Sequence, residues 1–178
     1  SKGIKNVRGI EPGAEVAKMA PKKIQKRIII NIFKPGQFKQ NTFDIICCFQ
    51  ILDHIIDPNK FINECYKILK PGGILLCINH DVSSFFNKIL GEKSPIIDIE
   101  HIYLFDQTTL PQLLIKHRFI KIRSFSVANR YPLIYWLRLL PLSKNIKNIL
   151  INSLGLIKLT GMRVWLKAGN MGTVAYKD

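Results

Sequence analysis

The sequence has 178 residues, of which 47% are hydrophobic and 22% charged, and its formal net charge is +15. This length suits one domain with a real core, since a 150-residue domain buries roughly 70% of its unfolded surface. The apolar content excludes intrinsic disorder, and no uncharged apolar run of about 18 residues is present that could cross a membrane. Residues 1–8 lack the apolar segment of a secretory signal, so we expect a cytoplasmic protein.

The positive charge is concentrated in the second half of the chain. Residues 107–177 contain 12 Lys and Arg side chains and no Asp or Glu. A field of one sign attracts anions such as nucleic acid, a phosphorylated substrate or an anionic membrane surface. Compositional drift is the alternative explanation, because Lys greatly outnumbers Arg throughout the chain.

The four cysteines do not form a recognisable metal or disulfide pattern. Cys47, Cys48, Cys65 and Cys77 show no C-x-x-C spacing, and three of them lie in apolar runs. This arrangement predicts buried thiols in a reducing compartment. We therefore expect no metal site.

Short β-like runs alternate with helical runs, which is the pattern of an α/β protein. The expected strands cover residues 6–10, 27–33, 43–49, 74–78, 119–127 and 172–176, and the expected helices cover 14–19, 58–69, 82–90 and 109–116. The run at residues 43–49 is continuously apolar, as in a strand covered on both faces. Asp57 suits the N-cap of the second helix, and either Asp106 or Thr108 suits the N-cap of the last.

Residues 129–169 separate the last two expected strands. They are too apolar for a free linker and they carry several basic side chains. We interpret them as an inserted basic helical cap. Within this segment, residues 131–160 could either cover the mouth of an active site or lie in a membrane interface, with apolar side chains on one helix face and basic ones on the other.

Three segments carry a resemblance to a known family. The first, VRGIEP at residues 7–12, is a strand that ends in an acid. The second, FDII at residues 43–46, continues into QILDHIIDP at residues 50–58, and the third is ILKPGGILL at residues 68–76. In this order and at these separations, the segments resemble class I S-adenosylmethionine-dependent methyltransferases.

The resemblance implies a Rossmann-like, mostly parallel sheet with flanking helices and an antiparallel last strand. This fold would occupy residues 1–128 and 170–178, with the cap of residues 129–169 inserted before the last strand. In the family's strand order, 3-2-1-4-5-7-6, the first strand lies in the centre and leads into a glycine-rich turn. Only ten residues precede Glu11, and they contain no G-x-G pattern. We therefore expect a partial chain without the first strand, and weak or no binding of S-adenosylmethionine.

The resemblance also implies a set of cofactor-binding residues. Glu11, followed by Pro12, stands where the family's acid binds the ribose, because a carboxylate at a strand end can accept hydrogen bonds from both hydroxyls. The family's adenine-binding acid has no counterpart here, so Phe33 is expected to stack on the adenine. Phe49 and Gln50 are expected at the methionine end of the cofactor. A solvated turn for Glu11 and a core position for Phe49 are the alternatives.

Three histidines are candidates for the acceptor side of the reaction. His54 lies in the Leu-Asp-His turn, His80 follows the strand at residues 74–78, and His101 lies in an Asp-Ile-Glu-His run. Methyl transfer needs proximity and orientation, together with a base when the acceptor is a hydroxyl, and histidine suits that role. Structural roles in fixing or packing the loops are the alternatives.

The expected function is methyl transfer to a small-molecule, glycan-linked or lipid-linked acceptor. A NAD or nucleotide-sugar Rossmann protein would also place an acid on a ribose, but it does not predict the second and third segments. A non-catalytic basic module could instead bind an anionic membrane or nucleic acid through residues 107–177. Nucleic acid is the weaker of these two partners, because the aromatic side chains in this region lie within apolar runs.

Overall fold

The computed structural model describes residues 4, 6–157 and 159–178. The chain divides into two compact units, Ser1–Lys39 and Gln40–Asp178. The boundary between them differs from the expected domain limits near residues 128 and 170.

The first unit is a small α/β arrangement. Its elements are β1 (Gly9–Ile10), α1 (Ala14–Lys18), α2 (Lys22–Gln25) and β2 (Ile28–Ile29), and β1 pairs in parallel with β2. Both strands are shorter than the sequence predicts. A turn ends β2, because the backbone N–H of Asn31 donates to the carbonyl of Ile29 at 3.0 Å and the Asn31 side chain accepts from the N–H of Ile32 at 2.8 Å.

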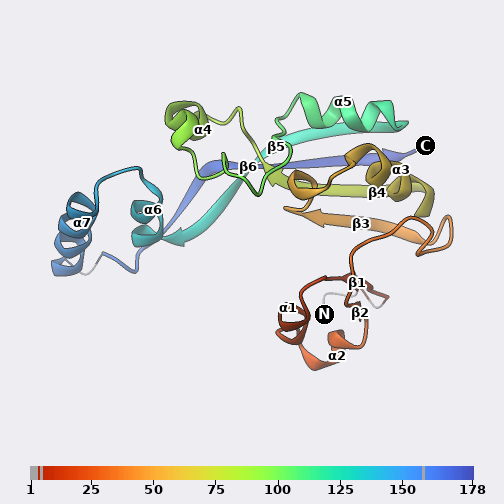
Figure 1. Ribbon diagram of the computed structural model, residues 1–178, viewed down its shortest axis with the longest axis horizontal. Helices are drawn as coiled ribbons and strands as arrows, with labels where there is room; N and C mark the ends of the chain where they lie inside the picture. Colours follow the sequence, from red (N-terminus) through yellow and green to blue (C-terminus); the bar gives the residue numbers. More distant parts are fainter. Residues whose placement is uncertain (1–3, 5, 158) are drawn as a thin grey trace. The chain divides into compact units, whose positions relative to one another are not determined.

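The second unit is built on a four-stranded sheet (Figure 1). Its strands are β3 (Phe43–Phe49), β4 (Leu69–His80), β5 (Phe119–Pro132) and β6 (Arg163–Lys177), in the order β3-β4-β6-β5. β3 is parallel to β4, and β6 is antiparallel to both β4 and β5. The predicted α/β class and the predicted antiparallel last strand are both confirmed.

The strand order matches the family pattern except at one position. β1 and β2 form one sheet and β3 to β6 form another, and no strand among the described residues joins the two. In the family's order these strands correspond to positions 2 and 3 and to positions 4, 5, 6 and 7. In the family's order the first strand stands between positions 2 and 4, and no strand among the described residues corresponds to it.

Helices α3 (Pro58–Ile68), α4 (Phe85–Leu90) and α5 (Thr109–Lys116) accompany the sheet, with short 3-10 turns η1 (Leu52–His54) and η2 (Gly91–Lys93). α3 begins as predicted, because the Asp57 carboxylate accepts the N–H of Lys60 at 2.9 Å. α5 is capped by Asp106, whose Oδ1 accepts the backbone N–H groups of Thr108 and Thr109 at 2.8 and 2.7 Å.

The Lys-Pro-Gly-Gly segment lies within β4, although the sequence predicts a helix that ends at residue 69 and a strand that begins only at residue 74. β4 already begins at Leu69, which pairs with Phe43, and the register then shifts before Ile45 pairs with Ile74. Gly72 takes a φ of 73°, and a Cβ on Gly73 would lie 2.8 Å from the carbonyl oxygen of Lys70. The two glycines therefore allow a bulge inside one long strand.

The core lies on one face of the sheet. Alternate residues of β4 and β6 on this face are fully buried, namely Leu75, Cys77, Met171, Thr173 and Ala175. α3 contacts β4, and α5 contacts β5 and β6. Ile45, Cys47 and Phe49 of β3 are exposed. The expectation that residues 43–49 are covered on both faces is therefore wrong for the described part of the chain.

The prediction of buried thiols is confirmed for Cys48, Cys65 and Cys77, which meet in this core, and it is wrong for Cys47, which is exposed. Cys48 of β3 makes thiol hydrogen bonds with Cys65 of α3 and Cys77 of β4, and these contacts lower the pKa of Cys48. The same contact with Cys48, together with burial, raises the pKa values of Cys65 and Cys77. The three thiols therefore join two strands and a helix.

β5 and β6 continue beyond the sheet as a two-stranded ribbon that carries α6 (Leu133–Leu139) and α7 (Lys144–Leu156) (Figure 1). The helical part is shorter than the predicted cap, because Asn129 pairs with Leu166 and Pro132 with Arg163. No residue of α6 or α7 is buried. The predicted cap helix extends to Lys158, which lies outside the described residues. Among the described residues, none of the helices has the length and apolar character needed to span a membrane.

Neighbouring leucines of β4 allow a test of the one-sided core. We expect Leu75→Ala to lower the free energy of unfolding by about 2–5 kcal/mol, since Leu75 is fully buried and truncation leaves a cavity. Leu76→Ala makes the same chemical change on the opposite, half-buried face and should cost less than half as much. Urea unfolding followed by circular dichroism measures both values. Equal losses would contradict the one-sided core.

The cap of α5 predicts a pH effect. The backbone N–H of Thr109 is the main cause that lowers the pKa of Asp106 from 3.8 to about 2. A carboxylate with a lowered folded-state pKa stabilises the fold above pH 4, and this contribution is lost as the pH falls towards 2. The wild type should therefore exceed Asp106→Asn by about 0.3–1 kcal/mol at pH 6 and match it near pH 2. A difference that stays constant between these pH values would contradict this role of Asp106.

Candidate active site

The site begins where the parallel strands β3 and β4 end. After Phe49 the chain turns at Gln50, which takes a φ of 49° and donates its backbone N–H to the carbonyl of Ile78 at 2.6 Å. The next residues form η1, which contains Asp53 and His54. Asparagine and histidine side chains at the end of β4 lie across from this turn. The carboxyl ends of the two strands thereby present several polar side chains in one place.

The buried residue Asp53 connects the segments of this region by hydrogen bonds. Its side chain is 1% exposed, and its Oδ1 accepts the amide of Asn79 at 3.0 Å. The backbone carbonyl of the same residue accepts the N–H groups of Ile102 and Tyr103 at 2.8 and 3.2 Å. Asp53 therefore holds the loop that carries His101 against the ends of β3 and β4.

The three predicted histidines come together at this point. The ring centroids of His54 and His101 lie 4.7 Å apart, and those of His80 and His101 lie 5.2 Å apart in an edge-to-face arrangement. The His101 side chain is 9% exposed, whereas His54 is exposed and His80 is half-buried. We call these three residues the histidine cluster.

All three imidazoles have the same ring nitrogen engaged. Each Nδ1 faces an oxygen acceptor; the pairs are His54 with the carbonyl of Glu100 at 2.8 Å, His80 with Oδ1 of Asn170 at 3.1 Å, and His101 with Oδ1 of Asp98 at 2.8 Å. A neutral imidazole that donates from Nδ1 keeps its lone pair on Nε2. The cluster therefore offers three Nε2 atoms that can accept a proton or bind a ligand.

The surroundings favour the neutral form of His80 and the charged form of Asp98. Burial lowers the pKa of His80, and the nearby Asp53 carboxylate only partly opposes this effect. Desolvation raises the pKa of Asp98, but hydrogen bonds from Glu100 and His101 outweigh it, so that the net shift is downward. An ionised Asp98 fixes the orientation of the His101 ring.

The predicted cofactor residues are divided between the two units. In the first unit, Glu11 is half-buried directly after β1, and its Oε1 accepts the N–H of Gly13 at 2.8 Å. Pro12 is exposed and Phe33 is half-buried. The roles that the resemblance implies for these residues stay predictions.

Phe49 and Gln50 belong to the second unit, beside the histidine cluster. The Phe49 side chain is 62% exposed, which excludes the core position considered from the sequence. The amide of Gln50 lies 3.4 Å from Oδ1 of Asn170, the same atom that faces His80. Gln50 is thereby connected to the cluster through a shared acceptor.

Sequence reasoning missed four residues that support the cluster. These are Asp53, Asn79, Asp98 and Asn170. The spacing of Asp98 and His101, three residues apart, was a usable signal for an acid that orients a histidine. Asn170 reaches His80 only through the antiparallel register of β4 and β6, which the sequence does not display.

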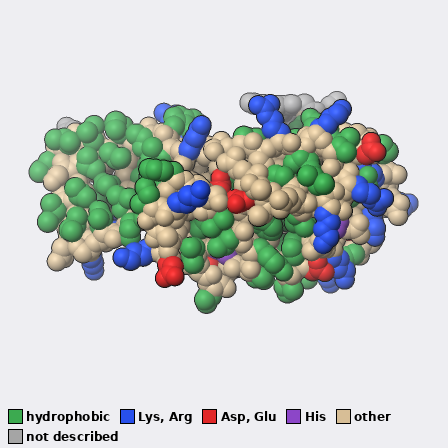
Figure 2. Space-filling model, turned by 90° about the horizontal axis from the view of Figure 1, so that it is seen from above, with side chains coloured by type: hydrophobic (Ala, Val, Ile, Leu, Met, Phe, Trp, Pro, Cys, Tyr) green, Lys and Arg blue, Asp and Glu red, His purple; other side chains and the backbone are tan. Residues whose placement is uncertain are grey.

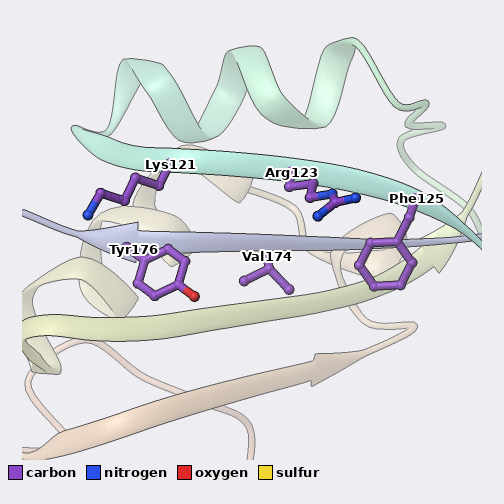
Figure 3. A pocket seen from close by; sticks show the side chains of 5 residues that line it. All are labelled: Lys121, Arg123, Phe125, Val174 and Tyr176. Carbon is purple, nitrogen blue, oxygen red and sulfur yellow. The ribbon is translucent and has the colours of Figure 1, made fainter.

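A separate hollow of about 430 Å³ lies on the sheet face away from α5 (Figure 3). It is lined by Lys121, Arg123, Phe125, Val174 and Tyr176. The hollow runs along β5 and β6 from the pair formed by Phe125 and Gly172 towards Tyr176, away from the Asn170 end of β6. Its two basic side chains belong to the acid-free region, but it contains no predicted site residue.

Comparisons with known proteins show a similarity to methyltransferases. A sequence profile described as "Methyltransferase domain" matches residues 1–77. The chain is 31% identical over 98 residues to a ubiquinone biosynthesis O-methyltransferase from Colwellia psychrerythraea, covering 49% of this chain and 39% of the relative. A SAM-dependent methyltransferase from Thermotoga maritima aligns with 96% of this chain and 72% of its own, at 17% identity and a TM-score of 0.63.

Residues 1–77 are thus similar to a methyltransferase domain, and the chain shares the fold of class I methyltransferases. A phosphoethanolamine N-methyltransferase from Haemonchus contortus, solved with S-adenosylhomocysteine, also shares the fold, at 17% identity and a TM-score of 0.51, over 96% of this chain and 43% of the other. The chain matches between 21 and 39% of the length of the curated relatives. In open α/β sheets, ligands generally bind outside the carboxyl ends of the parallel strands, and the histidine cluster lies at such ends.

Proposed function

We propose that the protein is an S-adenosylmethionine-dependent methyltransferase that acts on a hydroxyl oxygen of a small-molecule acceptor. The observation that carries this proposal is the histidine cluster, with three lone-pair Nε2 atoms at the carboxyl ends of β3 and β4. Relatives named ubiquinone biosynthesis O-methyltransferase support oxygen as the accepting atom. A hydroxyl is a weak nucleophile until it loses its proton, so such a reaction benefits from a positioned base.

S-adenosylmethionine would supply the methyl group on a sulfonium. The residues fit it in part: Glu11 stands at a strand end with a carboxylate suited to ribose hydroxyls, and the exposed Phe49 offers an apolar surface. The stretch at residues 28–33 has no acid for the adenine amino group, so Phe33 takes that place in our proposal. Structures such as the Haemonchus relative hold the demethylated cofactor, which supports this choice of cofactor.

The histidines would act on the acceptor. An Nε2 atom accepts the hydroxyl proton, and the Nδ1 hydrogen bond to a fixed oxygen stabilises the imidazolium that results. Among the three, His101 has the strongest support, because its partner Asp98 is a carboxylate at 2.8 Å. The half-buried His80 and the exposed His54 flank it and would orient the acceptor.

Cofactor binding can be tested on the 178-residue chain itself. We expect S-adenosylhomocysteine to shift the amide NMR signals of Glu11, Gly13, Phe49 and Gln50, with a dissociation constant weaker than micromolar. Glu11→Gln should weaken this binding roughly 10- to 100-fold, because hydrogen bonds to a charged acceptor contribute about 1.5–3 kcal/mol. Binding curves from the same spectra measure the effect.

Glu15→Gln is the matched control for this titration. Glu15 is an exposed acid on α1 that pairs with Lys18, so its replacement should leave the binding curve unchanged. Catechol, added after the cofactor analogue, should shift the ring signals of the histidine cluster but not those of His117. No shifts at Glu11 and Gly13 with millimolar analogue, or equal effects of the two variants, would contradict the proposed role of Glu11.

A lipid-linked acceptor is a second candidate, favoured by the surface of α6 and α7. Several large apolar side chains there are exposed, among them Ile146, Ile149, Leu150, Leu156 and Ile157. Figure 2 shows apolar side chains gathered over this end of the molecule, at the left of the view. Lys144 and Lys147 lie on the same helix. Aliphatic side chains beside lysines suit an anionic membrane surface better than they suit stacked nucleic-acid bases.

Liposome flotation tests this second candidate. We expect the protein to float with vesicles that contain anionic lipid and to float less with neutral vesicles. Ile149→Asp should reduce binding at least threefold, since burying a carboxylate in the interface is costly. Ile115→Asp on α5 is the control, because Ile149 and Ile115 are 64% and 63% exposed. Equal flotation with both vesicle types would exclude the membrane surface.

A further inference from the structure

We propose that Asp53, His80 and His101 bind one divalent transition-metal ion of the zinc class. Each of these residues offers a potential ligand atom, and the three atoms all lie within 4.8 Å of one another. They come from three separate parts of the chain: the turn after β3, the end of β4 and the loop before α5. The expectation of no metal site was based on the cysteine pattern and did not consider this cluster.

The hydrogen bonds of the two imidazoles are those of metal-bound histidines. His80 and His101 each have Nδ1 at an oxygen acceptor, Asn170 and Asp98 respectively, which leaves Nε2 to bind the ion. Histidine ligands in proteins are oriented in this way by a carboxylate or carbonyl-type oxygen behind the ring. The same arrangement makes each ring a better electron donor.

The burial of Asp53 points to a missing positive charge. The side chain is 1% exposed, and among the described residues no Lys or Arg forms an ion pair with it. A buried carboxylate is costly unless it is paired or coordinates a metal. The donors to it in the described part of the chain are neutral, namely the amide of Asn79 at 3.0 Å and the backbone N–H of His80 at 3.5 Å. A divalent ion held by two neutral imidazoles would neutralise this carboxylate.

Asn79 supplies a second, independent observation. Its Oδ1 is buried and has no hydrogen-bond partner among the described residues, although its Nδ2 donates to Asp53. A buried acceptor without a donor costs about 1–3 kcal/mol in general. A water molecule on the ion would be a donor close to this amide. One metal ion with a bound water molecule would therefore supply both the donor that Asn79 Oδ1 lacks and the positive charge that the Asp53 carboxylate lacks.

The donor set selects the kind of ion. Two imidazole nitrogens and one carboxylate suit zinc or ferrous iron with an open position, whereas magnesium prefers six oxygen ligands. Ligand atoms around a tetrahedral zinc ion lie about 3.3 Å apart. The atoms here must approach by up to about 1.5 Å, and His101 can move together with Asp98 because both lie in one loop.

The role of the ion rests on the proposed function. With three protein ligands the ion keeps one position open, where the acceptor hydroxyl could bind with a lowered pKa. With the ion bound, the Nε2 of His101 is occupied, so the base is then His54 and no longer His101; the Nε2 of His54 stays available because His54 is not one of the three ligands. The binding of the ion itself does not depend on this role.

A titration of the metal-free chain with Co²⁺ tests the proposal. We expect one equivalent to bind, with the visible absorption bands of a low-coordinate nitrogen and oxygen site, and Zn²⁺ but not Mg²⁺ to displace it. His80→Gln and His101→Gln should each weaken binding at least 10-fold. Asp98→Asn, which only supports the ring of His101, should weaken it by 10- to 100-fold. Circular dichroism verifies that each variant is folded.

His117→Gln is the matched control, because the Nε2 atom of His117 lies 3.1 Å from Asn59 and outside the cluster. This variant should bind Co²⁺ like the wild type. No stoichiometric binding, or binding that His117→Gln weakens and the cluster variants do not, would overturn the proposal. The titration uses neither cofactor nor acceptor, so a failure to bind Co²⁺ leaves the proposed methyl transfer standing. A failure to bind the cofactor analogue likewise leaves the metal proposal standing.

Discussion

The buried carboxylate of Asp53 is the interaction on which the candidate site depends. It lies in the turn after β3, bonds to the end of β4 through Asn79, and holds the loop of His101 through its own backbone carbonyl. Three segments far apart in the sequence therefore meet at one residue. Without this residue, the three histidines would belong to independent loops. Asp53 is only 1% exposed, and a buried carboxylate is destabilising unless a positive charge or a metal ion compensates it. The compensation of this carboxylate is therefore central to the candidate site.

Local sequence signals predicted the second unit well. The strand at residues 43–49 and the Asp57 cap of α3 depend on short-range patterns, and the structure has both as expected. The bulge at Gly72 and Gly73 was not predictable from the sequence, because the same residue types, glycine above all, occur in turns and in bulges. Only the pairing with the neighbouring strand shows which of the two is formed. The extent of β5 and β6 likewise depends on their mutual pairing, which overrides the helical pattern expected for residues 129–132 and 163–169.

The candidate site shows a similar division. Residue type and position after a strand were sufficient to select His54, His80 and His101, because parallel strands bring their carboxyl ends to one edge. The residues behind them could not be found in this way. Asn170 contacts His80 because of the pairing register between two strands, and the two residues are 90 positions apart in the sequence. The lack of a hydrogen-bond donor for Oδ1 of Asn79 results from the tertiary packing of the described residues, which sequence patterns do not display. The acid-free region, by contrast, supplies the ribbon, α6 and α7 rather than the cluster.

Within the ribbon formed by β5 and β6, strand β6 connects the region of α6 and α7 to the histidine cluster. β6 leaves the helical end at Arg163, bends at Gly169, where φ is 93°, and then places Asn170 behind His80. Gly169 also lies so close to Asn87 that a Cβ would come within 2.7 Å of its amide nitrogen. The exposed helices and the hydrogen-bond partner of His80 are therefore joined by one continuous strand.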